Sequence, residues 1–330
     1  MKITERRVAR ALRPGGPEVI EINLEQLPPL ETGEVLVRVE AVGLNHAETL
    51  IRSGSYAVRV PFPFLLGGEG AGTVLTAGPG VTIPSGARVC WAAVLGSCAD
   101  FLVVPSSMIV AIPEELSMEQ AACIAVAGLT AGGLARVWPL PKGSTAVVWG
   151  AAGAVGRMLV ALLADRGVNV IGIASGSRVD AVRAAGALHM IDRSTEDVRD
   201  AVRAHTRGRG ADAVFDPIGA TTFQTSLQML APRGCLINYG ELSGPAPVVD
   251  LHQLFAGSVF VTKYNGMRWV EGTHEFADLI SQALTLAVRR PAVISEVAGR
   301  FALDDVVEAY RALESDPRGK VLVIPSHNAS

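Results

Sequence analysis

Aromatic and charged residues are both scarce in this chain of 330 residues. Aromatic side chains make up 5% of the sequence and Asp, Glu, Lys and Arg together 18%, whereas 49% is hydrophobic. A buried core must therefore consist mainly of Ala, Val, Leu and Ile side chains. The 35 glycines point to tight turns and to helices packed closely on a sheet, which is typical of α/β proteins. The length suits two domains.

The sequence also lacks any concentration of one charge sign. Its formal net charge is −3, and no segment gathers Lys or Arg as a protein that binds a phosphate backbone would. We therefore expect no nucleic-acid partner.

Signals for secretion or for a membrane span are missing as well. The first ten residues carry charge but no apolar segment, so we expect no secretory signal. The most apolar stretch, residues 121–135, is shorter than the roughly 20 residues that cross a bilayer, and we interpret it as a buried helix. The cysteines at 90, 98, 123 and 235 lie far apart without C-x-x-C spacing. This spacing indicates reduced thiols in a cytoplasmic protein. Because no stretch is long enough to cross a bilayer, we expect no membrane partner.

The first hundred residues read as short strands separated by turns. Residues 35–39 (VLVRV) alternate apolar and polar side chains, as a half-buried strand does. Similar runs occupy 70–75, 87–91 and 101–104, with glycine and proline pairs between them. Many short strands of this kind predict a partly open β-barrel.

The pattern changes after Pro113. Ser117 and Gln120 fit a capping box that opens a long Ala-rich helix. Beyond it, short apolar runs alternate with helical periodicity up to a final helix at 304–315 and strand at 321–324. We predict further strands at 146–149, 168–174, 189–192, 213–215 and 235–239, and helices at 155–166, 178–185, 196–205 and 221–230. This alternation predicts a doubly wound parallel sheet of the Rossmann type, so the fold class is α/β.

A turn of small residues between the first strand and the first helix of this sheet is the most informative motif. Small residues let the backbone approach a pyrophosphate, whose charge meets N–H groups at the helix N-terminus. The strand before the turn and the helix after it give the context that a dinucleotide motif needs. We predict that a cofactor binds at Gly150, Ala151, Ala152, Gly153, Ala154, Val155 and Gly156.

The end of the second strand bears on the choice between NADP and NAD. An NAD enzyme usually has Asp or Glu there, about 20 residues past the glycines, to hold a ribose hydroxyl. This sequence has Ser175, Ser177 and Arg178 instead. Hydroxyls and a guanidinium suit a 2′-phosphate, although Arg178 could also be an ordinary surface residue. We predict NADP (NADPH) as the cofactor.

Several short motifs, spread over nearly the whole chain, stand in an order known from one superfamily. Besides the glycine turn they are GGPEV at 15–19, VGLN at 42–45, IRSGSY at 51–56, GEG at 68–70, GLTA at 128–131 and GADAVFDPIG at 210–219. By these motifs the chain resembles the medium-chain dehydrogenase/reductase superfamily, and within it the zinc-independent, zeta-crystallin-like quinone oxidoreductases. The resemblance implies a GroES-like barrel domain, residues 1–117 and 290–330, and a Rossmann NADP-binding domain, residues 118–289.

The resemblance also bears on metal binding. Alcohol dehydrogenases of the superfamily hold a catalytic zinc with Cys in the region of Asn45 and His in the region of Gly68, and only Glu69 remains here. A catalytic zinc needs about three protein ligands, and the four-cysteine structural lobe is missing too. We predict no metal site; His46 is the one residue that keeps the question open.

Site residues carry over from the resembled family position by position. There, residues matching Asn45 and Tyr56 lie near the nicotinamide, which implies that Tyr56 donates a hydrogen bond or proton to the acceptor and that Asn45 orients it. A loop aromatic is the alternative for Tyr56. With less force, cofactor contacts are expected of Asn45, Thr130, Arg193, Tyr239, Gly240, Lys263 and Lys320, each of which could instead be a packing or loop residue.

Without zinc, nothing obvious polarises an alcohol oxygen. The predicted reaction is therefore hydride transfer from NADPH to a small hydrophobic quinone or enone. One alternative is reduction of a 2-enoyl thioester of CoA or a carrier protein, which Tyr56 does not distinguish. Another, of a different class, is a non-catalytic NADPH-binding protein. A late strand at 259–262 is expected to pair across a two-fold axis, as in members of the superfamily, which predicts a homodimer.

Overall fold

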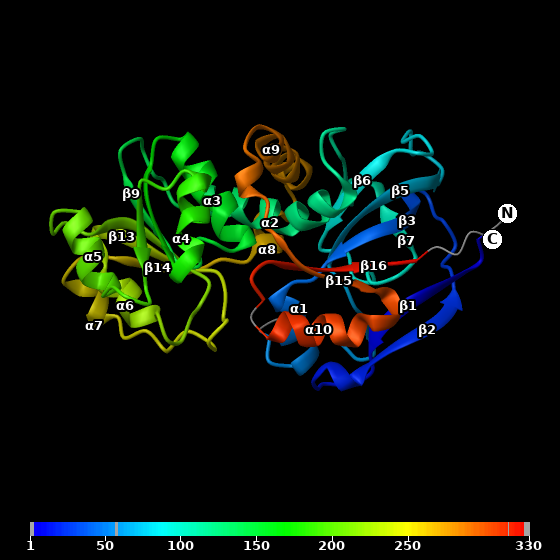
Figure 1. Cartoon of the computed structure of the whole chain (residues 1–330), viewed down its shortest axis with the longest axis horizontal. Helices are drawn as coiled ribbons and strands as arrows, with labels where there is room; N and C mark the ends of the chain where they lie inside the picture. The colour runs from blue at the N-terminus through cyan, green and yellow to red at the C-terminus, as the bar shows by residue number, and fades with distance from the viewer. Residues whose placement is uncertain (1–2, 57–58, 316, 327–330) are drawn as a thin grey trace. The chain divides into compact units, whose positions relative to one another are not determined.

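The structure, a computed structural model, describes residues 3–56, 59–315 and 317–326. By spatial contact the chain divides into two units, shown in Figure 1. The first contains residues 1–126, 274–288 and 295–330, and the second contains residues 127–273 and 289–294. The domain boundaries expected from the sequence, 117/118 and 289/290, remain a prediction.

The first unit is built on a curved, mostly antiparallel seven-stranded sheet. Its order is β15-β16-β3-β5-β6-β8, and β7 also pairs with β3. These strands are β3 (Glu34–Gly43), β5 (Glu69–Ala77), β6 (Arg88–Ala92), β7 (Phe101–Pro105), β8 (Ile109–Ala111), β15 (Val297–Ala302) and β16 (Lys320–Ile324). Alternate residues of β3, among them Val35, Val37 and Val39, are buried in its core, as their spacing predicts. The predicted GroES-like barrel is confirmed.

A smaller sheet of order β2-β1-β4 completes this unit. It contains β1 (Glu5–Ala11), β2 (Ile20–Gln26) and β4 (Phe64–Leu65). The helices and short 3-10 turns of the unit are α1 (His46–Ser53), the start of α2 (Met118–Val137), α9 (Glu275–Arg289), α10 (Val306–Glu314), η1 (Pro17–Val19), η2 (Ser106–Met108) and η5 (Leu303–Asp305).

The C-terminal tail returns to the first unit, as expected. Strand β16 pairs antiparallel with β3, so that Leu322 faces Gly43 and Val323 faces Val42. Helix α10 packs on β15 and β16 (Figure 1). This return brings Lys320, at the start of β16, beside the end of β3.

The second unit is a six-stranded parallel sheet with helices on both faces. The strand order is β11-β10-β9-β12-β13-β14. From β9 the next two strands are added on one side and β12 to β14 on the other, which confirms the predicted doubly wound Rossmann sheet. The strands are β9 (Thr145–Val148), β10 (Asn169–Ala174), β11 (His189–Asp192), β12 (Ala211–Asp216), β13 (Leu230–Asn238) and β14 (Phe260–Lys263). Helix α3 packs on α4 and α5 packs on α6, and the two pairs cover opposite faces of the sheet in Figure 1.

Four helices of the second unit begin close to the predicted residues: α3 (Ala154–Asp165), α4 (Val179–Ala185), α5 (Val198–His205) and α6 (Phe223–Gln228). The unit also contains the rest of α2, two short helices that the sequence analysis did not predict, α7 (His252–Phe255) and α8 (Gly266–Val270), and the 3-10 turns η3 (Gly176–Arg178) and η4 (Pro291–Val293). Helix α6 is shorter than the predicted 221–230 because residues just before it form hydrogen bonds to the buried carboxylate of Asp216. Asp216 accepts from the Thr222 hydroxyl at 2.9 Å and from the Gly219 N–H at 3.2 Å.

The capping box at the start of α2 is confirmed. Ser117 Oγ accepts from the backbone N–H of Gln120 at 3.1 Å, and Gln120 Oε1 accepts from that of Ser117 at 2.9 Å. Within the described ranges, α2 alone is long and apolar enough to span a bilayer, and 72% of its apolar window is buried. It is the buried helix that the sequence predicts.

Candidate cofactor and active site

The turn between β9 and α3 has the shape of a phosphate-binding loop. Gly150 adopts a φ of 62°, which favours glycine. A Cβ atom at Gly156 would lie 2.2 Å from the carbonyl oxygen of Gly150, so no side chain fits there without moving the loop. The glycines at these two positions are therefore required by the backbone itself.

This loop fits a pyrophosphate. The first N–H groups of a helix have no intrahelical acceptor, and in α3 these belong to Ala154, Val155 and Gly156. The first turn of α3 contains no acidic residue. Open N–H donors, the positive end of the helix dipole and small side chains together favour an anionic ligand.

The loop after β10 contains Ser175, Ser177 and Arg178, which the sequence assigns to the 2′-phosphate, and it lies beside Arg193, a further expected cofactor residue that follows β11. Arg193 Nε donates to the hydroxyl of Ser175 at 2.7 Å. The Arg193 N–H also bonds to the carbonyl of Ala174 at 3.0 Å. Arg178 ends the 3-10 turn η3 and leads into α4. Two guanidinium groups and a serine hydroxyl thus belong to one exposed loop region at the ends of β10 and β11.

Asp192, which the sequence analysis did not single out, belongs to the same loop region. Its Oδ1 accepts from the Gly176 N–H at 3.0 Å and from the N–H and hydroxyl of Ser194 at 2.9 and 2.5 Å. These bonds, that of the Ser194 hydroxyl first, lower the pKa of the Asp192 carboxyl. The sequence has no carboxylate at the end of β10, but the neighbouring strand β11 ends in one. A comparison of adjacent strand ends would have found it.

The ends of β13 and β14 hold three further expected cofactor residues: Tyr239, Gly240 and Lys263. Lys263 Nζ donates to Asn238 Oδ1 at 2.6 Å and to Glu241 Oε1 at 2.8 Å, so its ammonium group already has two partners. Asn238 is 2% exposed and bonds to the Asp216 carbonyl at 3.0 Å. Burial raises the pKa of the Tyr239 hydroxyl.

Thr130 lies half-buried in α2. One turn further along this helix, a Cβ atom at Gly133 would lie 1.9 Å from the Tyr264 hydroxyl oxygen. The glycine at 133 is therefore what lets Tyr264 pack against α2.

In the first unit, Asn45 is held by a buried ion pair. Lys320 Nζ bonds to Glu69 Oε1 and donates to Asn45 Oδ1 at 2.8 Å. The Asn45 Nδ2 donates to the same Glu69 oxygen at 2.9 Å. The side chains of Lys320 and Glu69 are 6% and 0% exposed. This arrangement fixes the Asn45 amide, with its oxygen toward the ammonium group.

Lys320, which the sequence assigns to the cofactor, has its ammonium group buried in this ion pair. Its contact with the cofactor stays a prediction. The cause of the burial is the pairing of β16 with β3. Gly43 lies in β3 so close to the pair that a Cβ atom there would be 2.7 Å from Lys320 Cε.

A second buried carboxylate borders this cluster. Glu48 Oε1 accepts from the Asn45 N–H at 3.2 Å, and Glu48 Oε2 bonds to the hydroxyl of Tyr310. Burial raises the pKa of the Glu48 carboxyl. Neither residue was predicted as part of the site. Glu48 lies three positions after Asn45, in the capping-box spacing that could have revealed it, whereas Tyr310 lies 262 positions from Glu48 in sequence.

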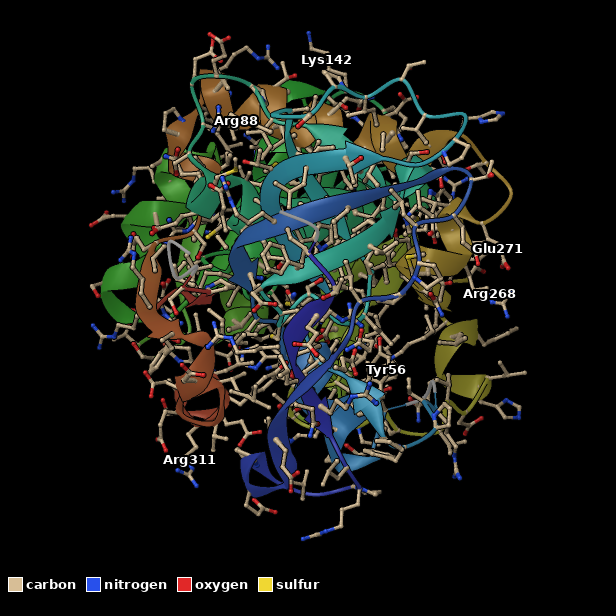
Figure 2. All side chains as sticks on the ribbon, turned by 90° about the vertical axis from the view of Figure 1, so that its right-hand side faces the viewer. Tyr56, Arg88, Lys142, Arg268, Glu271 and Arg311 are labelled. Atoms are coloured by element: carbon tan, nitrogen blue, oxygen red, sulfur yellow. The ribbon has the colours of Figure 1, made fainter. Side chains whose placement is uncertain are left out.

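Tyr56, which is labelled in Figure 2, follows α1 in the chain. Its backbone N–H donates to the carbonyl of Leu50 at 3.1 Å, and its side chain is half-buried. Asn45 caps the start of α1 and Tyr56 follows the end of the same helix, so one short helix positions both residues.

Metal ligands are not clustered in the part of the chain that the structure describes. No group of three or more His, Cys, Asp or Glu side chains there is arranged to hold an ion. Glu69, the one residue left from the zinc pattern, uses its second oxygen to accept the Val126 N–H at 2.7 Å.

Comparison with known proteins agrees with this architecture. Residues 31–148 match the family described as alcohol dehydrogenase GroES-like domain, and residues 154–285 match the family described as zinc-binding dehydrogenase. The two matched families define a medium-chain dehydrogenase/reductase.

Similar proteins narrow the family. A quinone oxidoreductase of Pseudomonas aeruginosa is 35% identical, covering 94% of this chain and 97% of the relative. A 2-haloacrylate reductase of Burkholderia is 30% identical, with 94% and 96% covered. The Escherichia coli quinone oxidoreductase solved with NADPH has a TM-score of 0.87 at 30% identity, covering 97% of this chain and all (100%) of that one. The chain belongs to the quinone oxidoreductase family of this superfamily and is an oxidoreductase.

Proposed function

We propose that the protein transfers hydride from NADPH to a quinone or an enone without a metal ion. The observation that carries this proposal is the phosphate loop, combined with a neighbouring loop where Arg193 bonds to Ser175. Solved relatives of this family contain NADPH. The nicotinamide supplies the hydride when the cofactor is bound, and the protein's own groups bind the phosphates and orient the acceptor.

Asn45 and Tyr56 are the proposed residues of the acceptor site. Because Lys320 and Glu69 fix the Asn45 amide, it costs little entropy to keep this side chain in one orientation. Tyr56 would donate a hydrogen bond or a proton to the oxygen on which negative charge develops. A quinone or enone is already electron-poor, so it needs no Lewis acid.

Independence from zinc is supported by the partners of Glu69. Asn45 stands in the region where the alcohol dehydrogenases of the superfamily have a zinc-binding Cys. The carboxylate of Glu69 is neutralised by the ammonium group of Lys320. A zinc ion would have to displace a buried cation, which is costly.

The decisive experiment compares NADPH and NADH oxidation with a small quinone and with a short enoyl-CoA, with and without a chelator. Rapid NADPH oxidation with the quinone, unaffected by the chelator, is the expected result. Turnover with the thioester alone would assign the protein to the enoyl reductases instead. Cofactor binding without turnover of any acceptor would favour a non-catalytic NADPH-binding protein.

We further propose a homodimer formed through β14. This strand lies at the edge of the parallel sheet, and an unpaired edge can add another strand. Large apolar side chains are exposed on and before it: Phe260 is 50%, Phe255 85% and Leu251 76% exposed. A light-scattering mass of one chain at micromolar concentration would contradict the dimer.

The buried, unpaired cysteines suit the proposed cytoplasmic location.

A further inference from the structure

A buried arginine lies in the first turn of α3, directly behind the phosphate loop. Arg157 is 7% exposed and is the fourth residue of the helix that starts at Ala154. Side chains of a helix lean toward its N-terminus, so a long side chain at this position reaches back under the turn. The Arg157 Nε donates to the carbonyl oxygen of Ala152 at 2.8 Å.

This hydrogen bond fixes one peptide plane of the loop. The peptide unit is planar and trans, so holding the carbonyl of Ala152 toward Arg157 directs the N–H of Gly153 the opposite way. That N–H donates to the carbonyl of Gly150 at 2.9 Å. The two bonds together maintain the turn at Gly150, from which the open N–H groups of α3 follow.

A second contact fixes the guanidinium itself. Arg157 Nη1 donates to the carbonyl of Ile294 at 3.4 Å. Ile294 ends the short segment 289–294 of the second unit. Arg290 ties the same segment to Asp165 at 2.8 Å and to the carbonyl of Ala185 at 3.1 Å. The guanidinium is thus held between the phosphate loop and a segment that is itself anchored to α3 and α4.

We propose that Arg157 is a positioning residue for the pyrophosphate of the cofactor: it holds the phosphate loop in its binding shape through its hydrogen bond to the Ala152 carbonyl. This inference rests on the proposed NADPH-dependent function. Both NADPH and NADH contain the pyrophosphate, so Arg157 must act on the two cofactors alike. Arg178, in contrast, is expected to act only on the 2′-phosphate.

The test is the affinity of Arg157→Gln for the two cofactors, measured by quenching of tryptophan fluorescence. We expect the Kd of NADPH and the Kd of NADH to rise by the same factor, about tenfold, as for the loss of a hydrogen bond to a charged group. Arg157→Lys keeps the charge but not the planar guanidinium group, so its Kd values should lie between those of Arg157→Gln and those of the wild type. In turnover, the KM for NADPH should rise while kcat changes little.

Arg166→Gln is the matched control, because Arg166 stands at the other end of α3 and its guanidinium bonds to the carbonyl of Ala135. It should bind both cofactors like the wild type. A melting temperature that falls in Arg157→Gln with both Kd values unchanged would overturn the proposal, and so would a loss for NADPH alone. If Arg157→Gln does not fold, Arg157→Lys is the test. NADPH should then raise the melting temperature of Arg157→Lys by less than it raises that of the wild type. A wild type that binds neither cofactor would instead contradict the proposed function.

Discussion

The two polar clusters of this protein are built in opposite ways. In the second unit, the phosphate loop presents backbone N–H groups at the start of α3 that the helix cannot satisfy. In the first unit, Asn45, Glu69 and Lys320 satisfy one another's polar atoms. The first arrangement leaves hydrogen-bond donors open to a ligand. The second, made of Asn45, Glu69 and Lys320, is closed, and we call it the frame. Substitutions should therefore impair binding in the loop and stability in the frame.

The largest effect is expected from Gly156→Val. A side chain at this position collides with the carbonyl of Gly150, so the loop must open and its N–H groups no longer converge. We expect no measurable NADPH binding by fluorescence titration, together with a stability loss of about 1–3 kcal/mol from overpacking. Gly143→Val controls for stability loss alone: a Cβ atom there meets nothing within 4 Å, but valine is strained at its φ of 88°, so this variant should lose stability and still bind NADPH like the wild type. Unchanged NADPH affinity in Gly156→Val would remove the loop from the cofactor site.

Lys320→Met tests the frame. It leaves the carboxylate of Glu69 buried without its cation, and breaking a buried pair costs about 3–5 kcal/mol. Chemical denaturation should show this loss, and Glu69→Gln in the same chain should restore most of it. Arg300→Met is the control, since its pair with Glu119 is exposed and surface pairs contribute little. If Lys320→Met is as stable as Arg300→Met, the frame has no structural importance.

The contrast between the clusters also explains what the sequence could predict. The phosphate loop is contiguous, and its function depends on backbone and small side chains, so residues 150–156 are readable as a motif. The frame joins residues far apart: 251 positions separate Lys320 from Glu69. Only the pairing of β16 with β3 brings them together, and no local pattern encodes that pairing. The prediction that Lys320 contacts the cofactor comes from the family resemblance, not from a local pattern.

Arg157 and Asp192 were missed for different reasons. The sequence places Arg157 in the helix after the glycines but does not reveal that its side chain turns back beneath the loop. Asp192 lies at the end of β11 and comes beside Gly176 because β10 and β11 pair in parallel, so it could have been found by comparing the ends of the predicted neighbouring strands. The fold class, in contrast, follows from periodicity alone, because each strand and helix is a local pattern.

Arg178→Ala tests whether the loop after β10 selects the cofactor. Loss of a charge-assisted bond to the 2′-phosphate should weaken NADPH binding by about 10- to 100-fold, while NADH, which lacks that phosphate, should bind nearly as before. The ratio of the two Kd values is the measurement. Arg183→Ala is suited as the control, because this exposed arginine pairs with Asp180 on α4. An equal loss for both cofactors would mean that Arg178 does not hold the phosphate.

The smallest effect concerns Asp192, whose negative charge lies in the same region, at the ends of β10 and β11, as Arg193 and Arg178. The carboxylate opposes a 2′-phosphate electrostatically, yet its Oδ1 also holds the backbone of Gly176 and Ser194. Asp192→Asn removes the charge and keeps an oxygen that can accept the same bonds, so NADPH should bind about threefold more tightly, as for one solvent-screened charge. Asp192→Ala removes both, and it should bind NADPH more weakly than Asp192→Asn because the loop loosens. Titration with each cofactor measures the difference. If Asn and Ala give the same Kd, the carboxylate acts by charge alone and does not shape the loop.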